Sequence, residues 1–339
     1  MEPAYGSNST ARTQATNSWG GTVLQVGAEF HLFVSEMANH CGLGAWTSAS
    51  QCSHAVGASA VGPFAYRDTA VGVWCHNAHA VFDPDTAEYF LFHIGNGTHD
   101  GRVANCTRSE GDGSGDDGGS MRLAPPQLPS PPANASGSSL HVARDPGGPW
   151  LPAEPLPGGT CNNPAPARLS NGSWLLACGS RELFMAPSPR GPWAGAGGRL
   201  PSAPAGQWWE DATLWQDARG ALHALFHAFT AEASPPAPQT CAGNLVSAHA
   251  FSGDGGTTWT VAADAPYANT FLRADGVPVT AATLERPKLF FGAGWGGAPI
   301  ALLNGAASLP GGEPACTGTC NRCKLEGWTY TLARALNVS

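Results

Sequence analysis

The stretch QWWEDATLWQDARGALHALFHAF, residues 207–229, contains a pattern that recurs along the chain and decides its fold. It begins near a polar pair, Glu210-Asp211, which an apolar segment, a tight turn and a second apolar segment follow. Short apolar segments that turn residues separate are typical of β-strands. The stretch therefore predicts two antiparallel strands with a polar pair at the start of the first one.

The same strand–turn–strand pattern occurs in four other places, at residues 18–35, 76–95, 162–180 and 285–305. In three copies the turn comes nine or ten residues after the polar position: Asn77 to Ala87, Asn163 to Gly172 and Asp211 to Gly220. Internal repeats of this kind indicate an architecture built from one repeated unit. That regular spacing is hard to obtain from helices.

A second motif, a turn followed by Gly-Pro and an aromatic residue, occurs at residues 58–64, 143–150 and 186–193. A fourth version, SGDGGTTW at 252–259, matches the Asp-box pattern S-x-D-x-G-x-x-W. In such turns the aspartate caps backbone N–H groups, glycine takes the strained dihedral angles and the aromatic ring packs beneath. The favoured interpretation is a hairpin clasp, and sugar binding is the alternative.

Five four-stranded units arranged around an axis make a five-bladed β-propeller, so the sequence predicts an all-β fold of this type. The 339 residues suffice for one large all-β domain. We expect an N-terminal arm over 1–17 and a single propeller domain over 18–339. The Gly-, Ser-, Asp- and Pro-rich segment at about 107–139 is expected to be a surface insertion within one blade.

The charge pattern excludes several partners. The net charge is −8, and only 17 residues are Lys or Arg, two of them lysine, with no basic run. Nucleic acid and anionic membranes are therefore poor candidates. No apolar run reaches the ~18 residues of a transmembrane helix. We expect a monomer without a membrane span.

Ten cysteines and six Asn-x-Ser/Thr sequons predict an extracellular or secretory-pathway glycoprotein with disulfides. Cys41 and Cys52 form a plausible local pair. The cysteines of CTGTCNRC, residues 316–323, favour disulfides over zinc, because a clear fourth ligand is missing. The N-terminus MEPAYGSNST has no basic and apolar signal regions, so either a signal peptide was removed or the compartment differs. The six sequons begin at Asn8, Asn96, Asn105, Asn134, Asn171 and Asn337.

The innermost strand of each blade starts at one end of the central channel, so polar residues there are expected to converge on one funnel. These positions are Ser18/Trp19, His76-Asn77, Asn162-Asn163, Glu210-Asp211 and Glu285-Arg286. Polar strand starts also arise from exposure and turn chemistry alone, which is the alternative explanation. Trp208 and Trp209 beside the acids suit the C–H faces of pyranose rings, although core packing is an equally common role.

This layout is similar to glycoside hydrolase family 43 and related five-bladed families over roughly residues 18–335, through architecture and short motifs. The resemblance implies inversion, with a blade I aspartate as base, a blade III aspartate tuning the acid and a blade IV glutamate as general acid. Inversion needs carboxyl groups ~6.5–9.5 Å apart so that water fits between base and sugar. Glu210 falls on the acid position, whereas Ser18/Trp19 and Asn163 carry no carboxylate.

Three alternatives account for the missing groups. Asp211 or Glu285 supplies a carboxylate, although adjacent strand residues point to opposite faces, so Glu210 and Asp211 are not expected to reach the same sugar. His76 acts as acid or base, since imidazole titrates in the right range. In the third alternative the protein keeps the funnel but not the chemistry.

Further roles concern the channel. His93 and His227, at the ends of matching second strands, are core histidines or line the channel near an ion. The resemblance implies a structural Ca²⁺ there, although no cofactor is required. Arg286 holds substrate groups bidentately or pairs with Glu285 or Asp211.

The sequence thus predicts a secreted glycoside hydrolase-like protein acting on a glycan or polysaccharide in the funnel. The alternative is a non-catalytic carbohydrate-binding or cell-surface interaction propeller. We expect the catalytic residues to be Glu210, Asp211 and His76. Those expected to bind carbohydrate are Asn77, Asn162, Asn163, Trp208, Trp209, Glu285, Arg286 and His227.

Overall fold

The computed structural model describes residues 3–6, 16–97, 137–157, 161–230, 246–272, 276–281, 283–292, 297–308 and 328–336. The expected insertion at about 107–139 lies outside the described residues except for its end, where β8 begins at Ser138, and the cysteine cluster at 316–323 lies outside them entirely. The same holds for four of the six sequons, those at Asn8, Asn105, Asn134 and Asn337.

Five four-stranded antiparallel sheets make up most of the structure, each with its strands in hydrogen-bonded order. Blade I contains β2 (Ser18–Val26), β3 (Glu29–Met37), β4 (Ser50–Gly57) and β5 (Ala65–Val71). Blade II contains β6 (His76–Asp83), β7 (Glu88–Ile94), β8 (Ser138–Ala143) and β9 (Glu154–Pro155). Blade III contains β10 (Ala165–Arg168), β11 (Trp174–Ala177), β12 (Glu182–Ala186) and β13 (Ala194–Arg199).

Blade IV contains β14 (Gln207–Gln216), β15 (Leu222–Thr230), β16 (Ser247–Ser252) and β17 (Thr260–Val261). Blade V contains β20 (Thr283–Phe290), β21 (Ala301–Ser308), β22 (Trp328–Ala335) and β1 (Tyr5–Gly6). The short helical elements between β3 and β4 are η1 (Ala38–His40), η2 (Leu43–Ala45) and α1 (Trp46–Ala49).

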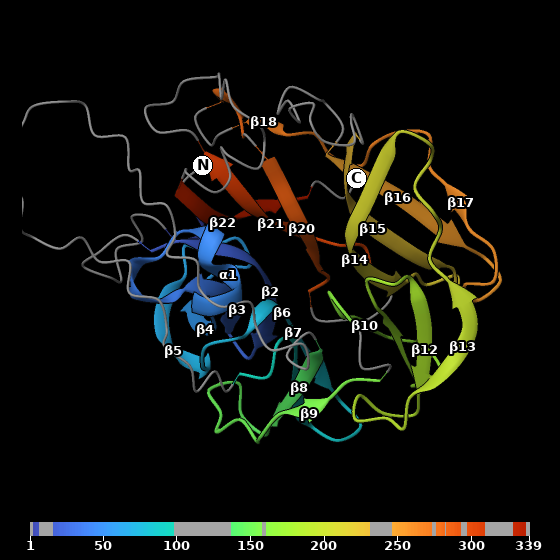
Figure 1. Cartoon of the computed structure of the whole chain (residues 1–339), viewed down its shortest axis with the longest axis horizontal. Helices are drawn as coiled ribbons and strands as arrows, with labels where there is room; N and C mark the ends of the chain where they lie inside the picture. The colour runs from blue at the N-terminus through green and yellow to red at the C-terminus, as the bar shows by residue number, and fades with distance from the viewer. Residues whose placement is uncertain are drawn as a thin grey trace, which may run out of the picture.

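The blades are arranged in a circle, as the order of colours in Figure 1 shows. The inner strands β2, β6, β10, β14 and β20 contact one another in that order, and β20 contacts β2 again. The circle is therefore closed, and the predicted five-bladed β-propeller is confirmed.

The chain start belongs to the last blade. Tyr5 and Gly6 pair with Thr331 and Tyr330 of β22, so β1 forms the outer edge of blade V. Part of the segment expected as a separate arm over 1–17 is thus a strand of the propeller. This pairing joins residues more than 300 positions apart, and no local pattern could predict it.

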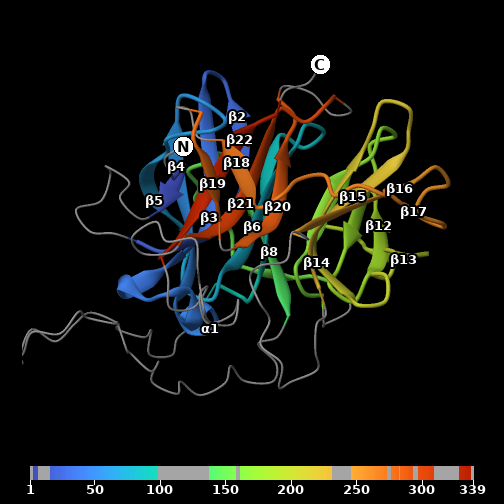
Figure 2. The ribbon, with the colours of Figure 1, turned by 90° about the horizontal axis from the view of Figure 1, so that it is seen from above.

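A two-stranded hairpin connects blades IV and V. It consists of β18 (Thr270–Leu272) and β19 (Pro278–Thr280), which pair antiparallel. Tyr267 and Phe271 pack against the blade V cluster that contains Leu284 and Leu332. Figures 1 and 2 show the hairpin beside this blade.

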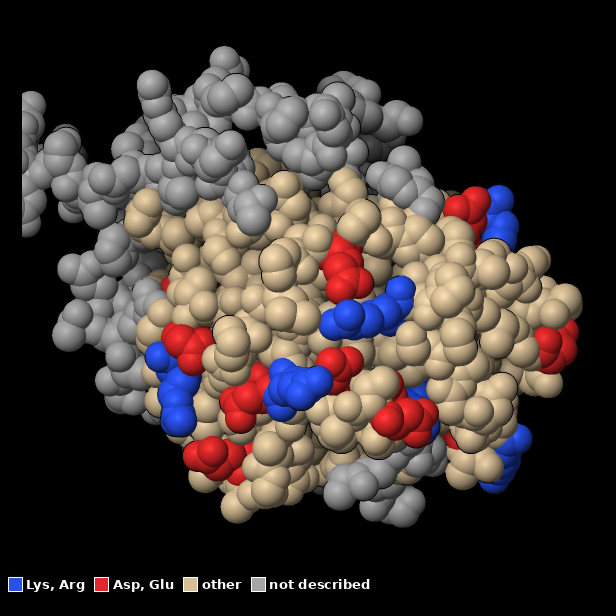
Figure 3. Space-filling view, turned by 90° about the horizontal axis from the view of Figure 1, so that it is seen from below, with Lys and Arg blue, Asp and Glu red and all other residues tan. Residues whose placement is uncertain are grey.

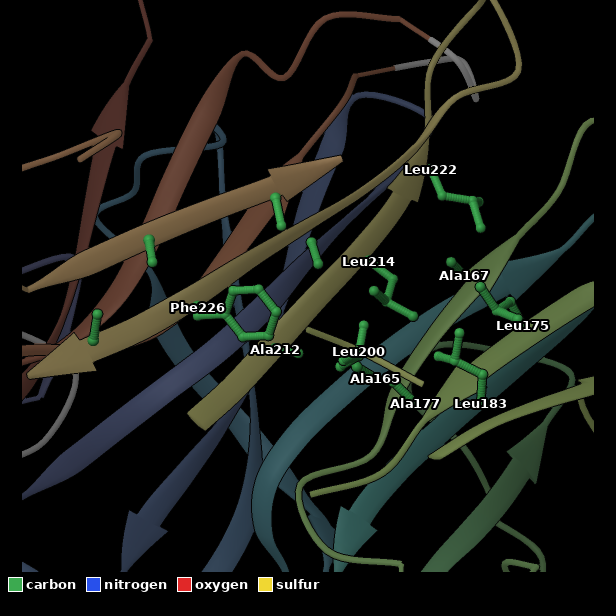
Figure 4. Close-up of a cluster of buried hydrophobic side chains, with 14 residues drawn as sticks. Ala165, Ala167, Leu175, Ala177, Leu183, Leu200, Ala212, Leu214, Leu222 and Phe226 are labelled. Carbon is green, nitrogen blue, oxygen red and sulfur yellow. The ribbon is translucent and has the colours of Figure 1, made fainter. Parts of the chain in front are cut away.

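The hydrophobic core is divided among the interfaces between neighbouring blades. The cluster between blades III and IV contains 14 buried residues, eight of them alanines (Figure 4). Small side chains allow the inner parts of two sheets to approach closely, while Leu214, Leu222 and Phe226 fill the wider parts. Alternation along each strand sends apolar residues to these interfaces.

The turns lie where the repeats predicted them. Ala87, Gly172 and Gly220 all have positive φ values, of 55°, 85° and 88°. They connect the first and second strands of blades II, III and IV. Left-handed dihedral angles are a feature of tight hairpin turns, so the spacing read from the sequence located these turns correctly.

The clasp motifs join the third and fourth strands of blades I to IV. In the Asp-box, Asp254 accepts hydrogen bonds from the Thr258 backbone and hydroxyl groups at 2.8 and 2.7 Å. Trp259 packs against the core between blades III and IV. This environment agrees with the interpretation as a hairpin clasp.

Two disulfides are formed among the described residues, Cys52–Cys75 and Cys161–Cys178. The predicted Cys41–Cys52 pair is wrong. Cys75 directly precedes β6 and lies 5.3 Å from Cys52 between Cα atoms, within disulfide range. Each bond joins segments that are close in sequence and in space.

One face of the molecule, shown in Figure 3, carries scattered charged side chains, and several acidic ones lie directly beside basic ones. This matches the charged content of 12%. Among the described residues, no helix has the length and apolar character needed to cross a membrane.

Candidate functional site

The inner strands share an irregularity near their first residues. In blades I, II, IV and V the register with the second strand shifts there, which marks a β-bulge. The extra residue is left-handed at Gly20, Asn77, Asp211 and Arg286, with φ values of 70°, 55°, 55° and 52°. Asn163 of blade III has a φ of 48°. Left-handed non-glycine residues are uncommon and gather at functional sites.

These five residues form what we call the channel ring: Gly20, Asn77, Asn163, Asp211 and Arg286. Asn77 Nδ2 donates to Asn163 Oδ1 at 2.9 Å. Arg286 Nη1 donates to the same oxygen at 3.1 Å and to Asp211 Oδ1 at 3.2 Å. The ring therefore joins blades II, III, IV and V by hydrogen bonds between side chains.

Blade I contributes Gly20, not the expected Ser18/Trp19. A Cβ atom on Gly20 would lie 3.3 Å from Arg286 Cβ, so the arginine side chain covers this glycine. Ser18 and Trp19 are fully buried, and the Ser18 hydroxyl donates to the Tyr5 carbonyl at 3.0 Å. The expected position was one residue too early, because the bulge turns the next residue toward the channel.

Four titratable side chains of blades IV and V form the mouth cluster: Glu210, Asp211, His227 and Glu285. One ligand atom of each lies within 4.8 Å of the others. The premise that Glu210 and Asp211 point to opposite faces of the strand is wrong, because one carboxylate oxygen of each lies within 4.8 Å of the other. It assumed a regular strand, whereas the left-handed bulge at Asp211 places both carboxylates at the same end of the channel.

Exposure separates the two adjacent acids. The Glu210 side chain is 37% exposed, and its Oε1 lies 3.5 Å from His227 Nδ1. The Asp211 side chain is 0% exposed and forms an ion pair with Arg286 at 3.2 Å. Glu210 is therefore accessible to solvent, while Asp211 lies buried behind it.

The acids differ in protonation as well. Burial raises the pKa of Glu210, but the contact with His227 outweighs it and leaves the pKa below its ordinary value. Burial also raises the pKa of Asp211, and the nearby Arg286 offsets this only in part. The buried acid is thus the more readily protonated of the two.

Arg286 forms an ion pair, which was one of the two roles considered for it. Its guanidinium group is engaged by Asp211 and Asn163 at the channel ring. Its partner is Asp211, one of the two acids suggested by the sequence. This arrangement fixes the arginine in the channel wall.

Several expected site residues lie elsewhere. His76 is buried, with Nδ1 2.8 Å from the Ser50 hydroxyl and its ring 4.8 Å from that of Trp46. Asn162 is exposed beside the ring residue Asn163. His76 therefore faces blade I, away from the mouth cluster.

The two tryptophans lie on opposite faces of β14. Trp209 stacks on Phe226 with ring centroids 5.2 Å apart, and its Nε1 donates to Gln207 Oε1. Trp208 is 57% exposed and lies two residues before Glu210, hence on the same strand face. Core packing describes Trp209, while Trp208 offers an aromatic surface next to the acid.

The two histidines expected at matching positions are not equivalent. Glu210 pairs with His227 across β14 and β15, whereas His76 pairs with Ile94 across β6 and β7. The position equivalent to His227 is therefore Ile94, and His93 lies one residue before it. The buried ring of His93 stacks on that of His141, with ring centroids 5.1 Å apart. Burial lowers the pKa of His93 to about 3. His93 is a core histidine, and His227 belongs to the mouth cluster.

The residues two positions after those of the channel ring form the next level of the channel, and the sequence analysis did not identify them. This level holds Thr22, His79, Ala165, Thr213 and Lys288, the first paired residues after each bulge and their counterpart in blade III. Lys288, one of only two lysines, is directly followed by the apolar residues Leu289 and Phe290, which was the available signal. A second available signal, for the ring position of blade I, was Gly20 in the glycine pair of the SWGG segment.

This level of the channel does not fit the Ca²⁺ that the family resemblance implies. Calcium binds six to eight oxygen ligands, and carboxylates are common among them. Here the side chains are an ammonium group, an imidazole, a methyl group and two hydroxyls, and the Thr213 hydroxyl donates to the Pro287 carbonyl. In the mouth cluster Arg286 already occupies one Asp211 oxygen.

No family model matches the chain, and no curated protein matches it by sequence. Solved structures do match. The exo-β-1,3-galactanase of Phanerochaete chrysosporium, solved with β-1,3-galactotriose, gives a TM-score of 0.56 at 10% identity. That match covers 99% of this chain and 64% of the galactanase, so the chain spans about two thirds of its length.

Two further matches cover most of both chains. A putative exo-β-1,3-galactanase from Bifidobacterium bifidum gives a TM-score of 0.58 at 8% identity, covering 99% and 93%. The catalytic domain of a family 62 α-L-arabinofuranosidase from Coprinopsis cinerea gives 0.56 at 11%, covering 99% and 96%. The chain has the fold of the five-bladed glycoside hydrolases. The resemblance to family 43 predicted this fold, and at these identities the likeness establishes the fold alone.

Proposed function

We propose that this protein is a glycoside hydrolase that binds a glycan end in the funnel, with Glu210 as the proton donor. The observation that carries the proposal is the mouth cluster, where a partly exposed carboxyl group lies within 4.8 Å of three buried titratable groups. Perturbed acids gathered in a concave site are typical of catalytic centres. The fold, shared with glycoside hydrolases, supports the same assignment.

The neighbouring groups control the proton of Glu210. Without a ligand the contact with His227 outweighs burial and the charge of Glu285, so the pKa of Glu210 lies below its ordinary value. A proton donor needs the opposite shift, so the proposal requires that a bound glycan raises this pKa by excluding water from Glu210. Glu285 lies too close to Glu210 to serve as the base of an inverting reaction, which needs ~6.5–9.5 Å. We assign Glu285 and the buried Asp211 the tuning role that the family resemblance gave to a blade III aspartate.

Trp208 and Asn163 are the proposed sugar contacts. The exposed Trp208 ring, on the Glu210 face of β14, suits the apolar face of a pyranose. Asn163 uses its Oδ1 within the channel ring, so its Nδ2 group remains to donate to a hydroxyl. Because two matching structures are galactanases, β-1,3-linked galactan is the first substrate to test.

The test is hydrolysis of β-1,3-galactan, other plant and algal polysaccharides and aryl glycosides by the wild type and Glu210→Gln. We expect release of sugar by the wild type and a loss of about 10²–10⁴-fold in the variant. Glu182→Gln, at an exposed residue of β12 in blade III, is the matched control. Unchanged hydrolysis in Glu210→Gln would eliminate the assigned acid.

A non-catalytic glycan-binding propeller is the second candidate. The observation in its favour is that blades I, II and III place Gly20, Asn77 and Asn163 in the channel ring, none of which is a carboxylate. This candidate expects binding on a glycan array without turnover, and no effect of Glu210→Gln on affinity. Glycan release that depends on Glu210 would exclude it.

We also propose an extracellular location and a monomeric state. The disulfides Cys52–Cys75 and Cys161–Cys178 support an oxidising compartment. Secretion from a eukaryotic host, followed by glycosidase treatment and gel filtration, tests location, the sequons at Asn96 and Asn171 and the oligomeric state together.

A further inference from the structure

Lys288 is a buried charge for which the mouth cluster has no use. Its side chain is 1% exposed, and Nζ has no hydrogen-bond partner within the part of the chain that the structure describes. Burial lowers its pKa to about 8. A buried charge is costly unless it is paired, so a lysine at this position calls for a partner in the channel.

The ammonium group lies close to the channel axis. Lys288 belongs to β20 of blade V, yet its charge acts on His79 of blade II and is itself stabilised by Asp211 of blade IV. Blades II and V are not neighbours in the circle of inner strands. Lys288 and His79 are the first paired residues after the bulges of their inner strands, so they stand at the same level below the channel ring, and their mutual influence agrees with a Lys288 side chain that faces the channel.

Two acceptors there are also without partners among the described residues. Asp211 Oδ2 is buried and unpaired, whereas Oδ1 holds Arg286. His79 donates to the Pro164 carbonyl through one ring nitrogen, which leaves the buried and unpaired Nδ1 as an acceptor. An ammonium group with three donors matches this pair of acceptors.

We propose that Lys288 is the resident cation of the central channel, linked to Asp211 Oδ2 and His79 Nδ1 through buried water. None of these three atoms has a direct hydrogen-bond partner among the described residues, and buried water bridges polar groups of this kind with two to four hydrogen bonds. With Arg286 above and Lys288 below, the Asp211 carboxylate has a cation on each side. Lys288 thus acts as a positioning residue for Asp211 and takes the place that a metal ion would need. This inference concerns the channel and stands whether or not the protein hydrolyses a glycan.

The test is a double-mutant cycle of Lys288→Met and Asp211→Asn, measured by thermal unfolding at pH 7. Replacing a buried charge by an apolar residue can raise stability by itself, so the coupling between the two sites is the readout. We expect Lys288→Met to be less favourable in the wild type than in the Asp211→Asn background, by at least about 2 °C in melting temperature. Equal changes in both backgrounds would overturn the proposal.

A second arm concerns metal ions. After dialysis against EDTA, we expect added Ca²⁺ to leave the melting temperature of the wild type unchanged. A rise of several degrees would contradict a channel that already holds its own cation. If Lys288→Met does not fold, Lys288→Arg and Lys288→Gln replace it. The charge-retaining variant is then expected to melt higher, and equal or reversed melting temperatures would reject the proposal.

Discussion

Glu210 and Asp211 are consecutive residues of β14, yet their carboxylates lie within 4.8 Å of each other at one end of the channel. A regular strand would point them to opposite faces. The left-handed conformation of Asp211, with a φ of 55°, removes that alternation. The bulge therefore places a buried acid directly beside a partly exposed one.

Gly20→Ala tests the packing of the channel ring in blade I. The new methyl group would lie 3.3 Å from Arg286 Cβ, at a residue with a φ of 70°. We expect a loss of about 1–3 kcal/mol, from backbone strain and displacement of the arginine. Gly27→Ala is the control, since Gly27 has a φ of 61° and no atom within 4 Å of the added Cβ. Urea unfolding of both variants separates strain from contact, and equal losses would argue against the Arg286 contact.

Asn163→Leu tests the hydrogen bonds of the ring. The substitution removes the acceptor shared by Asn77 and Arg286, so we expect a loss of about 1–3 kcal/mol in unfolding free energy. Asn163→Asp keeps an acceptor at this position and should lose less. A leucine variant as stable as the aspartate variant would show that the shared acceptor contributes nothing.

His227→Gln tests the control of the Glu210 proton. His227 lowers the pKa of Glu210, while burial and Glu285 raise it, so removal of the histidine should move that pKa upward. If Glu210 must be protonated, the alkaline limb of the kcat/KM profile shifts to higher pH. His223→Gln on the same strand is the control. A limb that stays in place or moves downward would refute this pairing.

Asp254→Asn tests the role of the Asp-box as a clasp. Hydrogen bonds from the Thr258 backbone and side chain lower the pKa of Asp254 to about 2. A carboxyl group whose pKa is lowered in the folded state stabilises that state. The stabilisation is fully present above the ordinary pKa of 3.8 and is lost as the pH falls toward 2. The variant should therefore melt below the wild type at pH 6, with a gap that narrows on acidification, and hydrolysis should be unaffected. Asp264→Asn, also exposed, is the control, and a constant gap would contradict the proposed linkage.

Local patterns were sufficient to predict the architecture. The turns at Ala87, Gly172 and Gly220 and the Asp-box at Asp254 depend on dihedral angles and hydrogen bonds between near neighbours. Such features leave a trace in the residue types themselves. The five copies followed, and so did the position of Glu210 at the channel.

Features that depend on distant contacts or on single-residue shifts were not predicted. The bulge moved the ring position of blade I from Trp19 to Gly20. The sequence repeats were also misaligned by one residue, so that His93 was matched with His227 although Ile94 is the equivalent residue. The pairing of β1 with β22 joins the two ends of the chain. A shift by one residue reverses the face of a strand, so alternation alone could not locate these side chains.

A proton donor at Glu210 makes hydrolysis depend on the leaving group in a way that no other role of this residue does. A glycan or an alkyl glycoside needs a proton on its departing oxygen, whereas 2,4-dinitrophenolate departs without one. If Glu210 is the proton donor, Glu210→Gln reduces kcat/KM about 10²–10⁴-fold on a natural β-linked glycan and far less on the matching dinitrophenyl glycoside. Equal losses on both substrates, or no loss on either, would contradict this role.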